Sequence, residues 1–115
     1  SRVTNLGNIP KGHYLAVDVE DGRAMLNTKP SVALAQFKRE KRFGGTVADG
    51  ITVVTLEPEI LRHHYVDLAG SRFDGDVVPY LSERGDEPGL GAFWRDLADP
   101  CFGALSGRGR LGVGA

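Results

Sequence analysis

The 115-residue sequence has one cysteine, one tryptophan and no excess of charge of either sign. Because Cys101 has no second cysteine to pair with, we expect a fold that needs no internal disulfide, in a reducing compartment. The 14 basic and 15 acidic side chains nearly balance, which argues against a dedicated nucleic-acid binder. No apolar run approaches the roughly 20 residues of a membrane span, and no stretch has signal-peptide order. We therefore expect a cytoplasmic protein without a membrane partner.

Several catalytic motifs are missing as well. The sequence has no Gly-x-Ser-x-Gly elbow, no phosphate loop ending in Gly-Lys-Ser/Thr, and no His-Glu-x-x-His. The acidic stretch around Asp74 and Asp76 lacks the positions of an EF-hand loop. These absences leave the question of enzymatic activity open, and we expect neither a bound cofactor nor a metal.

What is present predicts a single α+β domain over residues 1–115. Residues 12–19 alternate between apolar and polar side chains, which predicts a strand, and Glu-Asp-Gly at 20–22 predicts a hairpin leading to a partner strand at 23–27. A helix capped by Thr28 is expected from Pro30 to about Phe43, and the β-branched run at 51–56 predicts a third strand. Residues 12–56 would thus form a β-β-α-β sheet-and-helix scaffold.

The predicted core of this scaffold lies between its sheet and its helix. Leu15, Val17 and Val19 share one face of the first strand, and Phe37 heads the apolar face of the helix. Packing these two faces together would bury side chains worth about 1.5–3 kcal/mol each.

The second half, residues 57–105, is expected to be mostly helical or irregular. Apolar spacing predicts a helix over residues 58–69, with a strand as the alternative, and another over residues 90–97. Between them we expect one short helix or turn capped by Asp76. The glycine-rich residues 106–115 have too little apolar content to fold alone, which predicts a flexible tail, mobile or held by a partner.

The stretch Arg-His-His-Tyr-Val-Asp contains the candidate catalytic residues. On a helix, His63 and His64 diverge by about 100°, so the pair cannot ligate one metal, whereas His63 and Asp67 would form an exposed i, i+4 pair. His64 falls on the apolar side, where it is either a hydrogen-bonded core histidine or a general acid or base. In the second case Asp18 or Asp67 would orient it.

Two further groups are candidate binding residues. Aromatic side chains dominate protein interfaces, and the sequence offers Tyr65, Tyr80, Phe93 and Trp94 as either core residues or contacts. The basic cluster at the end of the predicted helix supplies Lys38, Arg39 and Arg42, which form either a solvated face or a grip on phosphate. Arg108 and Arg110, spaced by glycine, could contribute to the same phosphate contact.

Three functions follow from these features. The first is an accessory domain that binds a protein partner or forms a homo-oligomer through Tyr80, Phe93 and Trp94, without catalytic machinery of its own. The second is a small acid/base enzyme or small-molecule-binding protein with a pocket near His64 and Tyr65. The third, which the overall charge disfavours, is nucleic-acid binding through residues 38–42 and the tail.

Overall fold

The computed structural model describes residues 3–7, 9–85 and 87–112. Within these ranges the chain has three α-helices, one 3-10 turn and ten strands, in agreement with the predicted α+β class. The helical elements are η1 (Arg23–Met25), α1 (Pro30–Arg39), α2 (Val47–Leu56) and α3 (Ile60–His63). The strands are β1 (Val3–Asn5), β2 (Tyr14–Val17), β3 (Phe43–Gly44), β4 (Tyr65–Asp67), β5 (Ser71–Phe73), β6 (Val77–Arg84), β7 (Glu87–Trp94), β8 (Phe102–Ala104), β9 (Ser106–Gly107) and β10 (Gly109–Gly112).

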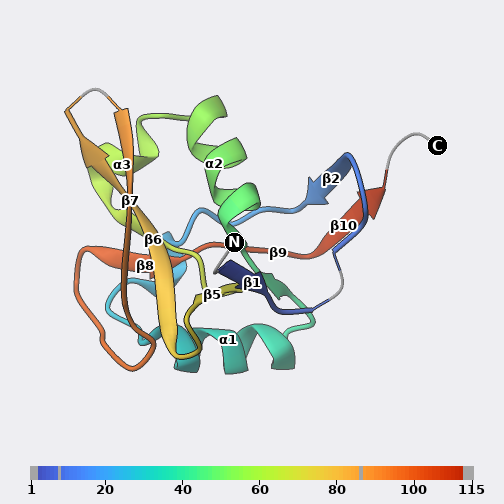
Figure 1. Ribbon diagram of the computed structural model, residues 1–115, viewed down its shortest axis with the longest axis horizontal. Helices are drawn as coiled ribbons and strands as arrows, with labels where there is room; N and C mark the ends of the chain where they lie inside the picture. Colours follow the sequence, from blue (N-terminus) through green and yellow to red (C-terminus); the bar gives the residue numbers. More distant parts are fainter. Residues whose placement is uncertain (1–2, 8, 86, 113–115) are drawn as a thin grey trace.

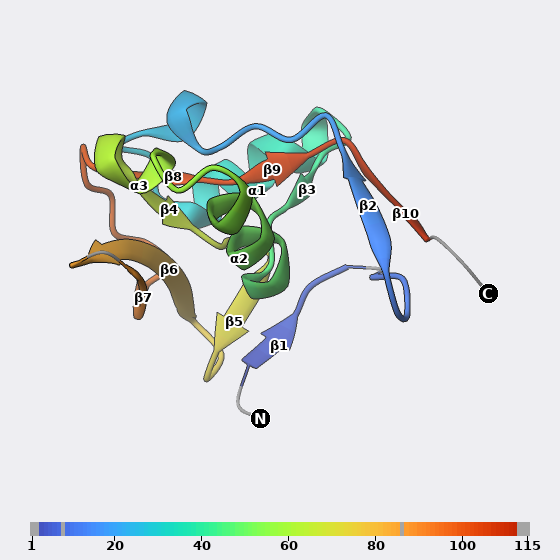
Figure 2. The ribbon, with the colours of Figure 1, turned by 90° about the horizontal axis from the view of Figure 1, so that it is seen from above.

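One six-stranded sheet forms the centre of the molecule. Its strands run in the order β1-β5-β6-β4-β8, and β7 pairs with β6. The β4–β8 pair is parallel and the other pairs are antiparallel. Two smaller ribbons, β3–β9 and β2–β10, continue from this sheet. Figure 1 shows the β6–β7 hairpin at one end of the molecule and the β2–β10 ribbon at the other, and Figure 2 shows the same separation from above.

Helices cover both faces of the central sheet (Figure 1). On one face, α2 and α3 pack on the sheet through the apolar cluster of Val54, Ile60, Leu61, Val66, Leu68, Leu81 and Leu105. On the other, α1 and η1 pack through Met25, Ala33, Phe37, Ala69 and Ala104. Strand alternation places neighbouring residues on opposite faces, so Val66 enters the first cluster while Tyr65 and Asp67 point to the second face.

Helix α1 confirms the predicted helix start at Pro30 but ends at Arg39 rather than near Phe43. Its N-cap is Lys29, and Thr28 does not cap the helix as predicted, because its hydroxyl donates to the Leu26 carbonyl instead. Lys41 follows with a φ of 59°, a left-handed conformation that ends the helix.

The predicted β-β-α-β order is wrong at two elements. Residues 23–27 form the turn η1 rather than a strand, because Gly22 adopts a φ of 104° and the Glu20 carboxylate accepts hydrogen bonds from the amides of Gly22 and Ala24. Residues 51–56 belong to α2. The Thr46 hydroxyl accepts from the Asp49 amide while the Asp49 carboxylate accepts from the Thr46 amide, and this capping box overrides the strand preference of the β-branched run.

The predicted core face of the first strand is also wrong. Leu15 is 58% exposed, and Val17 and Val19 are each 39% exposed, because the side of β2 that faces α2 carries Tyr14 and Ala16, which line a cavity with Ala48 and Thr52. Phe37 is buried as expected, but in a cluster with Met25, Ala69 and Ala104 rather than against Leu15, Val17 and Val19.

The predicted helices of the second half are largely strands. Only Ile60–His63 of the predicted 58–69 helix is helical, since His64 turns to an extended φ of −160° and leads into β4. The short helix or turn expected after Asp76 is strand β6 instead, and the helix expected over 90–97 is β7 up to Trp94. β6 and β7 pair with each other over eight residues of each strand. This pairing stabilises the extended conformation, and the apolar spacing of the sequence gives no sign of it.

The prediction of a flexible tail from residue 106 is wrong for the described residues. β9 pairs with β3, and β10 pairs with β2, so residues 106–107 and 109–112 are held in ladders. Gly107 allows this approach, because a Cβ there would lie 2.3 Å from the Phe43 ring. Residues 113–115 of the predicted tail lie outside the described residues. Among those described, no helix combines the length and the apolar character needed to cross a bilayer.

Candidate functional site

Two basic segments that are far apart in the sequence meet beside the β2–β10 ribbon. Pairing of β3 with β9 brings the end of α1 next to the glycine-rich segment. There the Nε of Arg42 donates to the Ser106 hydroxyl at 3.0 Å. Arg42 and Arg108 then share one carboxylate, that of Asp18, at 3.7 Å and 3.0 Å. The convergence leaves two guanidinium groups with a single counterion.

Two cavities of about 540 Å³ each lie on either side of this junction. We call the first the α1 cavity; its cationic lining residues are Lys38, Arg42, Arg72, Arg95 and Arg110. We call the second the ribbon cavity; its cationic lining residues are Lys41, Arg42, Arg108 and Arg110. Both cavities share Arg42, Phe43 and Arg110, so together they form one basic groove. Of the described residues that line the groove, none is acidic.

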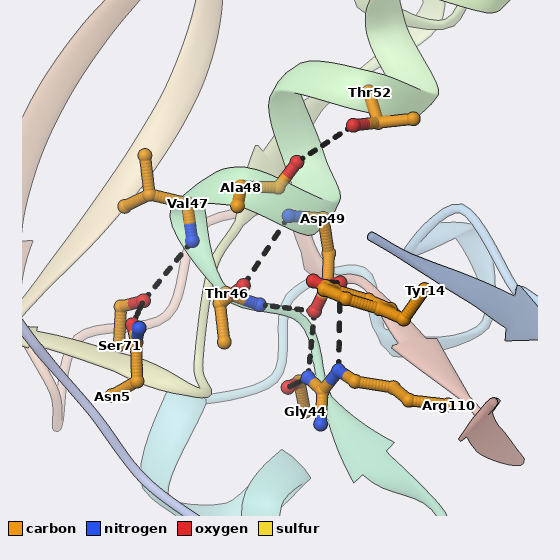
Figure 3. A network of polar contacts seen from close by, with 10 residues as sticks. All are labelled: Asn5, Tyr14, Gly44, Thr46, Val47, Ala48, Asp49, Thr52, Ser71 and Arg110. Carbon is orange, nitrogen blue, oxygen red and sulfur yellow. Dashed lines mark hydrogen bonds and ion pairs between the residues drawn. The ribbon is translucent and has the colours of Figure 1, made fainter. Parts of the chain in front are cut away.

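A buried carboxylate fixes the wall between the two cavities. Asp49, at the start of α2, accepts hydrogen bonds from the Arg110 Nη2 at 2.6 Å, the Tyr14 hydroxyl at 2.5 Å and the Thr46 amide at 2.9 Å. Figure 3 shows these groups converging on Asp49, with the Arg110 Nη2 also donating to the Gly44 carbonyl. The network ties the β2–β10 ribbon to the N-terminus of α2.

The electrostatics of this network favour an ionised Asp49. Burial alone would raise the pKa of Asp49, but the hydrogen bonds from Arg110, the Thr46 amide and Tyr14 lower it below its ordinary value. Burial and the neighbouring Asp49 carboxylate raise the pKa of Tyr14. Tyr14 therefore stays a hydrogen-bond donor, and the Arg110–Asp49 pair stays charged, with side chains only 5% and 3% exposed.

Arg110 also stacks on an aromatic ring, with its guanidinium carbon 3.6 Å from the Phe43 ring centroid. This cation–π contact orients the arginine while its Nε and Nη2 both donate to Asp49. Lys41, on the rim, holds a φ of 59° that glycine adopts more easily, at a cost of about 1 kcal/mol. Glycine would adopt this backbone conformation with less strain, but only lysine adds a positive charge to the rim.

The seven cations of the groove outnumber the carboxylates that pair with them. Arg42 and Arg108 share Asp18, Arg110 pairs with Asp49, and Arg95 lies near two carboxylates, those of Asp76 and Asp96. Among the described residues, no carboxylate lies within ion-pair distance of the remaining three, Lys38, Lys41 and Arg72. The groove therefore has a local positive excess on a chain whose formal net charge is −1.

The predicted catalytic residues do not form one group. His64 is buried; its Nδ1 lies 3.0 Å from the Tyr65 carbonyl and its Nε2 lies 3.4 Å from Asp21 rather than from Asp18 or Asp67. Asp18 is 60% exposed and pairs with arginines of the basic groove. A cavity of about 230 Å³ includes Asp21, but His64 lines neither this cavity nor the basic groove. The expected i, i+4 pair of His63 and Asp67 is wrong, since α3 ends at His63.

Asp67 is, with Asp49, one of two buried aspartates among the described residues, and it has no comparable hydrogen-bond network. It is 1% exposed in β4, and neither carboxylate oxygen has a hydrogen-bond partner in the part of the chain described. Burial, reinforced by the charge of Asp99, raises the pKa of Asp67 to about 7. A carboxyl group in this state is mostly protonated below neutral pH.

The structure brings three of the four predicted aromatic binding residues together. Tyr65, Tyr80 and Phe93 lie on the α1 face of the sheet around Phe102, with ring centroids 4.9–5.4 Å apart. All four rings are half-buried. Trp94 points to the opposite face of β7 and is 49% exposed.

Of the three predicted basic binding residues, two line the basic groove and one does not. Lys38 and Arg42 line the groove, whereas Arg39 is exposed and lines neither of its cavities. Arg72 and Arg95 were not predicted, because each is a lone arginine in a segment rich in acidic residues. Asp49 was also missed, although Thr46-x-x-Asp49 is a capping-box spacing that could have indicated its helix.

The described residues contain no group of three or more His, Cys, Asp or Glu side chains placed to hold a metal ion. The geometry is that of a small α+β domain with an arginine-rich groove. Residues 3–112 match the model of DUF5701, a family of unknown function, and the chain belongs to that family. Neither the curated proteins nor the solved structures gave a match.

Proposed function

We propose that this chain is a binding domain for a small anionic molecule, which it takes up in the basic groove. The observation that carries the proposal is the lining of the two cavities, where seven cationic side chains from separate segments meet and no acidic residue is found among those described. Arginine suits such a site because its planar fork donates two parallel hydrogen bonds to a carboxylate or phosphate.

Energetics support anion binding at this position. Concentrating like charges costs free energy in the empty groove, and a bound anion would relieve that repulsion. Each charge-assisted hydrogen bond would contribute roughly 1.5–3 kcal/mol. Since Asp49 already holds Arg110 in place, the guanidinium is preorganised and little further side-chain entropy is lost on binding.

The test is calorimetric titration with inorganic triphosphate, using variants that differ only in whether the altered cation faces the groove. We expect Lys38→Gln and Lys41→Gln each to weaken binding about three- to tenfold. Arg39→Gln is the matched control, because Arg39 lies between these lysines in the sequence yet lines neither cavity, and its affinity should be unchanged.

Equal losses in all three variants would show attraction to general surface charge and would contradict a groove site. Absence of triphosphate binding by the parent chain at low salt would also contradict it. A steep fall of affinity with salt for single-stranded nucleic acid, exceeding that for triphosphate, would favour the nucleic-acid function instead.

A second function is favoured by a different observation, the exposed side of β7. Among the described residues β7 pairs with β6 alone, and it presents Leu90 (53% exposed) and Trp94 (49% exposed) on one face with Phe93 on the other. An open strand edge flanked by apolar side chains is suited to strand pairing. We propose that two copies of the chain associate antiparallel through β7.

Light scattering over a concentration series tests this association. We expect the mass to rise towards that of a dimer and Trp94→Ala to shift the midpoint to at least tenfold higher concentration. Leu56→Ala is the control, since Leu56 is 76% exposed on α2, away from β7. A monomeric mass at every concentration would rule the association out.

A further inference from the structure

The two cavities of the basic groove differ in their apolar lining. The α1 cavity is bordered by Leu6, Leu34 and Ala35 in addition to the shared Phe43. Leu6 is 40% exposed, Leu34 is half-buried and Ala35 is exposed, so this wall is open to a ligand. At about 540 Å³ the cavity is within the range of small-molecule sites.

Arg72 lines this cavity and is unusually buried for an arginine. It is only 8% exposed, and both hydrogen bonds that it donates to described residues leave from Nη1, to the carbonyls of Ala69 (2.7 Å) and Ser71 (2.9 Å). The carbonyls fix the guanidinium but do not neutralise it. A buried cation held by neutral acceptors is costly, and an anion at its free side would offset that cost.

A second guanidinium is close to Arg72 and also lines the cavity. Burial lowers the pKa of Arg72, and the charge of Arg95 lowers it further, while Asp76 acts in the opposite direction. The Nε of Arg95 lies 3.5 Å from Asp76 and 3.6 Å from Asp96, and its side chain is 44% exposed, so part of the guanidinium stays open to solvent. Because both arginines line the same cavity, one anionic group bound there can accept hydrogen bonds from both.

We infer that the α1 cavity binds an amphiphilic organic anion, with a carboxylate or phosphate head group between Arg72 and Arg95 and an apolar body against Leu6, Leu34 and Ala35. This inference rests on the proposed anion-binding function and names the class of its ligand. The ribbon cavity, whose apolar lining beyond the shared Phe43 is Ile9 and Pro10, would take no part in holding the apolar body.

The experiment titrates four probes into the full chain below their micellar concentrations: octanoate, octyl phosphate, acetate and octanol. We expect octanoate or octyl phosphate to bind at least tenfold more tightly than acetate, and octanol to bind weakly because it lacks the charge. The stronger of the two anions identifies the head group.

Two variants on one helix locate the apolar body. Ala35→Trp fills the cavity without changing its charge, and we expect it to weaken octanoate binding at least tenfold. Val32→Trp adds the same side chain at a position that is 50% exposed on α1 and lines neither cavity, so its affinity should match the parent. Arg95→Gln should weaken octanoate about five- to tenfold and leave octanol unchanged.

The inference would be overturned if neither octanoate nor octyl phosphate bound more tightly than acetate, or if Ala35→Trp left the affinity for the tighter of the two unaltered. If triphosphate still bound in that case, with loss on Lys38→Gln, the anion-binding function would stand and only the amphiphilic ligand would be wrong. If triphosphate also failed to bind, both would be wrong.

Discussion

The regions around Asp49 and Asp67 each bury one aspartate, and they treat it in opposite ways. Asp49 is surrounded by an arginine, a tyrosine hydroxyl and a backbone amide, all donating to its oxygens. Asp67 lies in a central strand with no hydrogen-bond donor for either oxygen among the described residues. Burial disfavours the charged form in both places, and only the donors around Asp49 reverse that effect.

The difference teaches that burial of a carboxylate does not by itself define a site. Around Asp49 the charge is retained and serves to position Arg110 at the basic groove. Around Asp67 the proton is retained up to a pKa of about 7, so the residue behaves as a neutral polar group through the acidic range. The two regions therefore contribute to stability with opposite dependence on pH.

The largest effect should come from breaking the Asp49 network. Asp49→Asn keeps the shape of the side chain but leaves the Arg110 guanidinium buried without its counterion, which we expect to cost about 3–5 kcal/mol of unfolding free energy at pH 7. Urea unfolding followed by circular dichroism measures this. Glu59→Gln, at an exposed residue before α3, is the control and should change stability by less than about 0.5 kcal/mol.

The same loss should appear in the parent chain on acidification. Because the pKa of Asp49 is lowered in the folded state, its stabilising contribution is complete above the unfolded value of 3.8 and is lost as the pH falls through the folded value. A stability difference between the parent and Asp49→Asn that is as large at pH 2 as at pH 5 would contradict the assignment, and this comparison cancels the contribution of Asp67.

The next effect, of opposite sign, belongs to Asp67. The folded chain keeps the Asp67 proton up to about pH 7, whereas the unfolded chain releases it near 3.8, so stability should fall as the pH rises through this window. The difference in unfolding free energy between Asp67→Asn and the parent should therefore shift in favour of the variant by about 2–3 kcal/mol from pH 5 to pH 8. Urea unfolding at the two pH values gives the difference.

A gain of the same size at both pH values would mean that packing rather than ionisation explains the effect of the Asp67 substitution. The carboxyl carbon of Asp67 offers an independent readout, because its NMR shift should titrate near pH 7. A midpoint near 4 would show that the group is not held neutral.

The smallest effect should follow removal of a single donor. Tyr14→Phe deletes the hydroxyl that donates to Asp49 at 2.5 Å but leaves the Arg110 pair in place, so we expect a cost of about 1–2 kcal/mol. Tyr65→Phe is the matched control, since no described hydrogen bond uses its hydroxyl, and unfolding in urea should distinguish the two. A Tyr14→Phe cost equal to that of Asp49→Asn would mean that the tyrosine, not the arginine, holds the network together.

Sequence reasoning succeeded where the information is local and failed where it is not. Proline at the first helical turn and the apolar spacing around Phe37 predicted α1, and alternation predicted the β2 strand. The partner of β2 could not be predicted, because β10 lies more than 90 residues away and its glycines read as a disordered tail. Helical spacing of Phe93 and Trp94 was misleading, since the pairing of β7 with β6 outweighs it.

The candidate site was predictable only in fragments for the same reason. Lys38 and Arg42 stood out as a cluster, and Arg110 was recognised as a basic residue spaced by glycine. That these residues face one another depends on the pairing of β3 with β9, which no local pattern encodes. Arg72 carried no sequence pattern at all, because its importance arises from burial.

The attachment of the β2–β10 ribbon to the rest of the molecule has a consequence for its motion. Arg110 is at once a strand residue of the ribbon, a partner of Asp49 and a wall of both cavities. Local opening that separates the ribbon from the rest of the molecule also removes a wall of the groove. Opening of the ribbon and loss of the binding site are therefore the same conformational equilibrium. Whatever fills the groove must therefore slow hydrogen exchange at the backbone amides of β2 and β10, even at residues that it never touches.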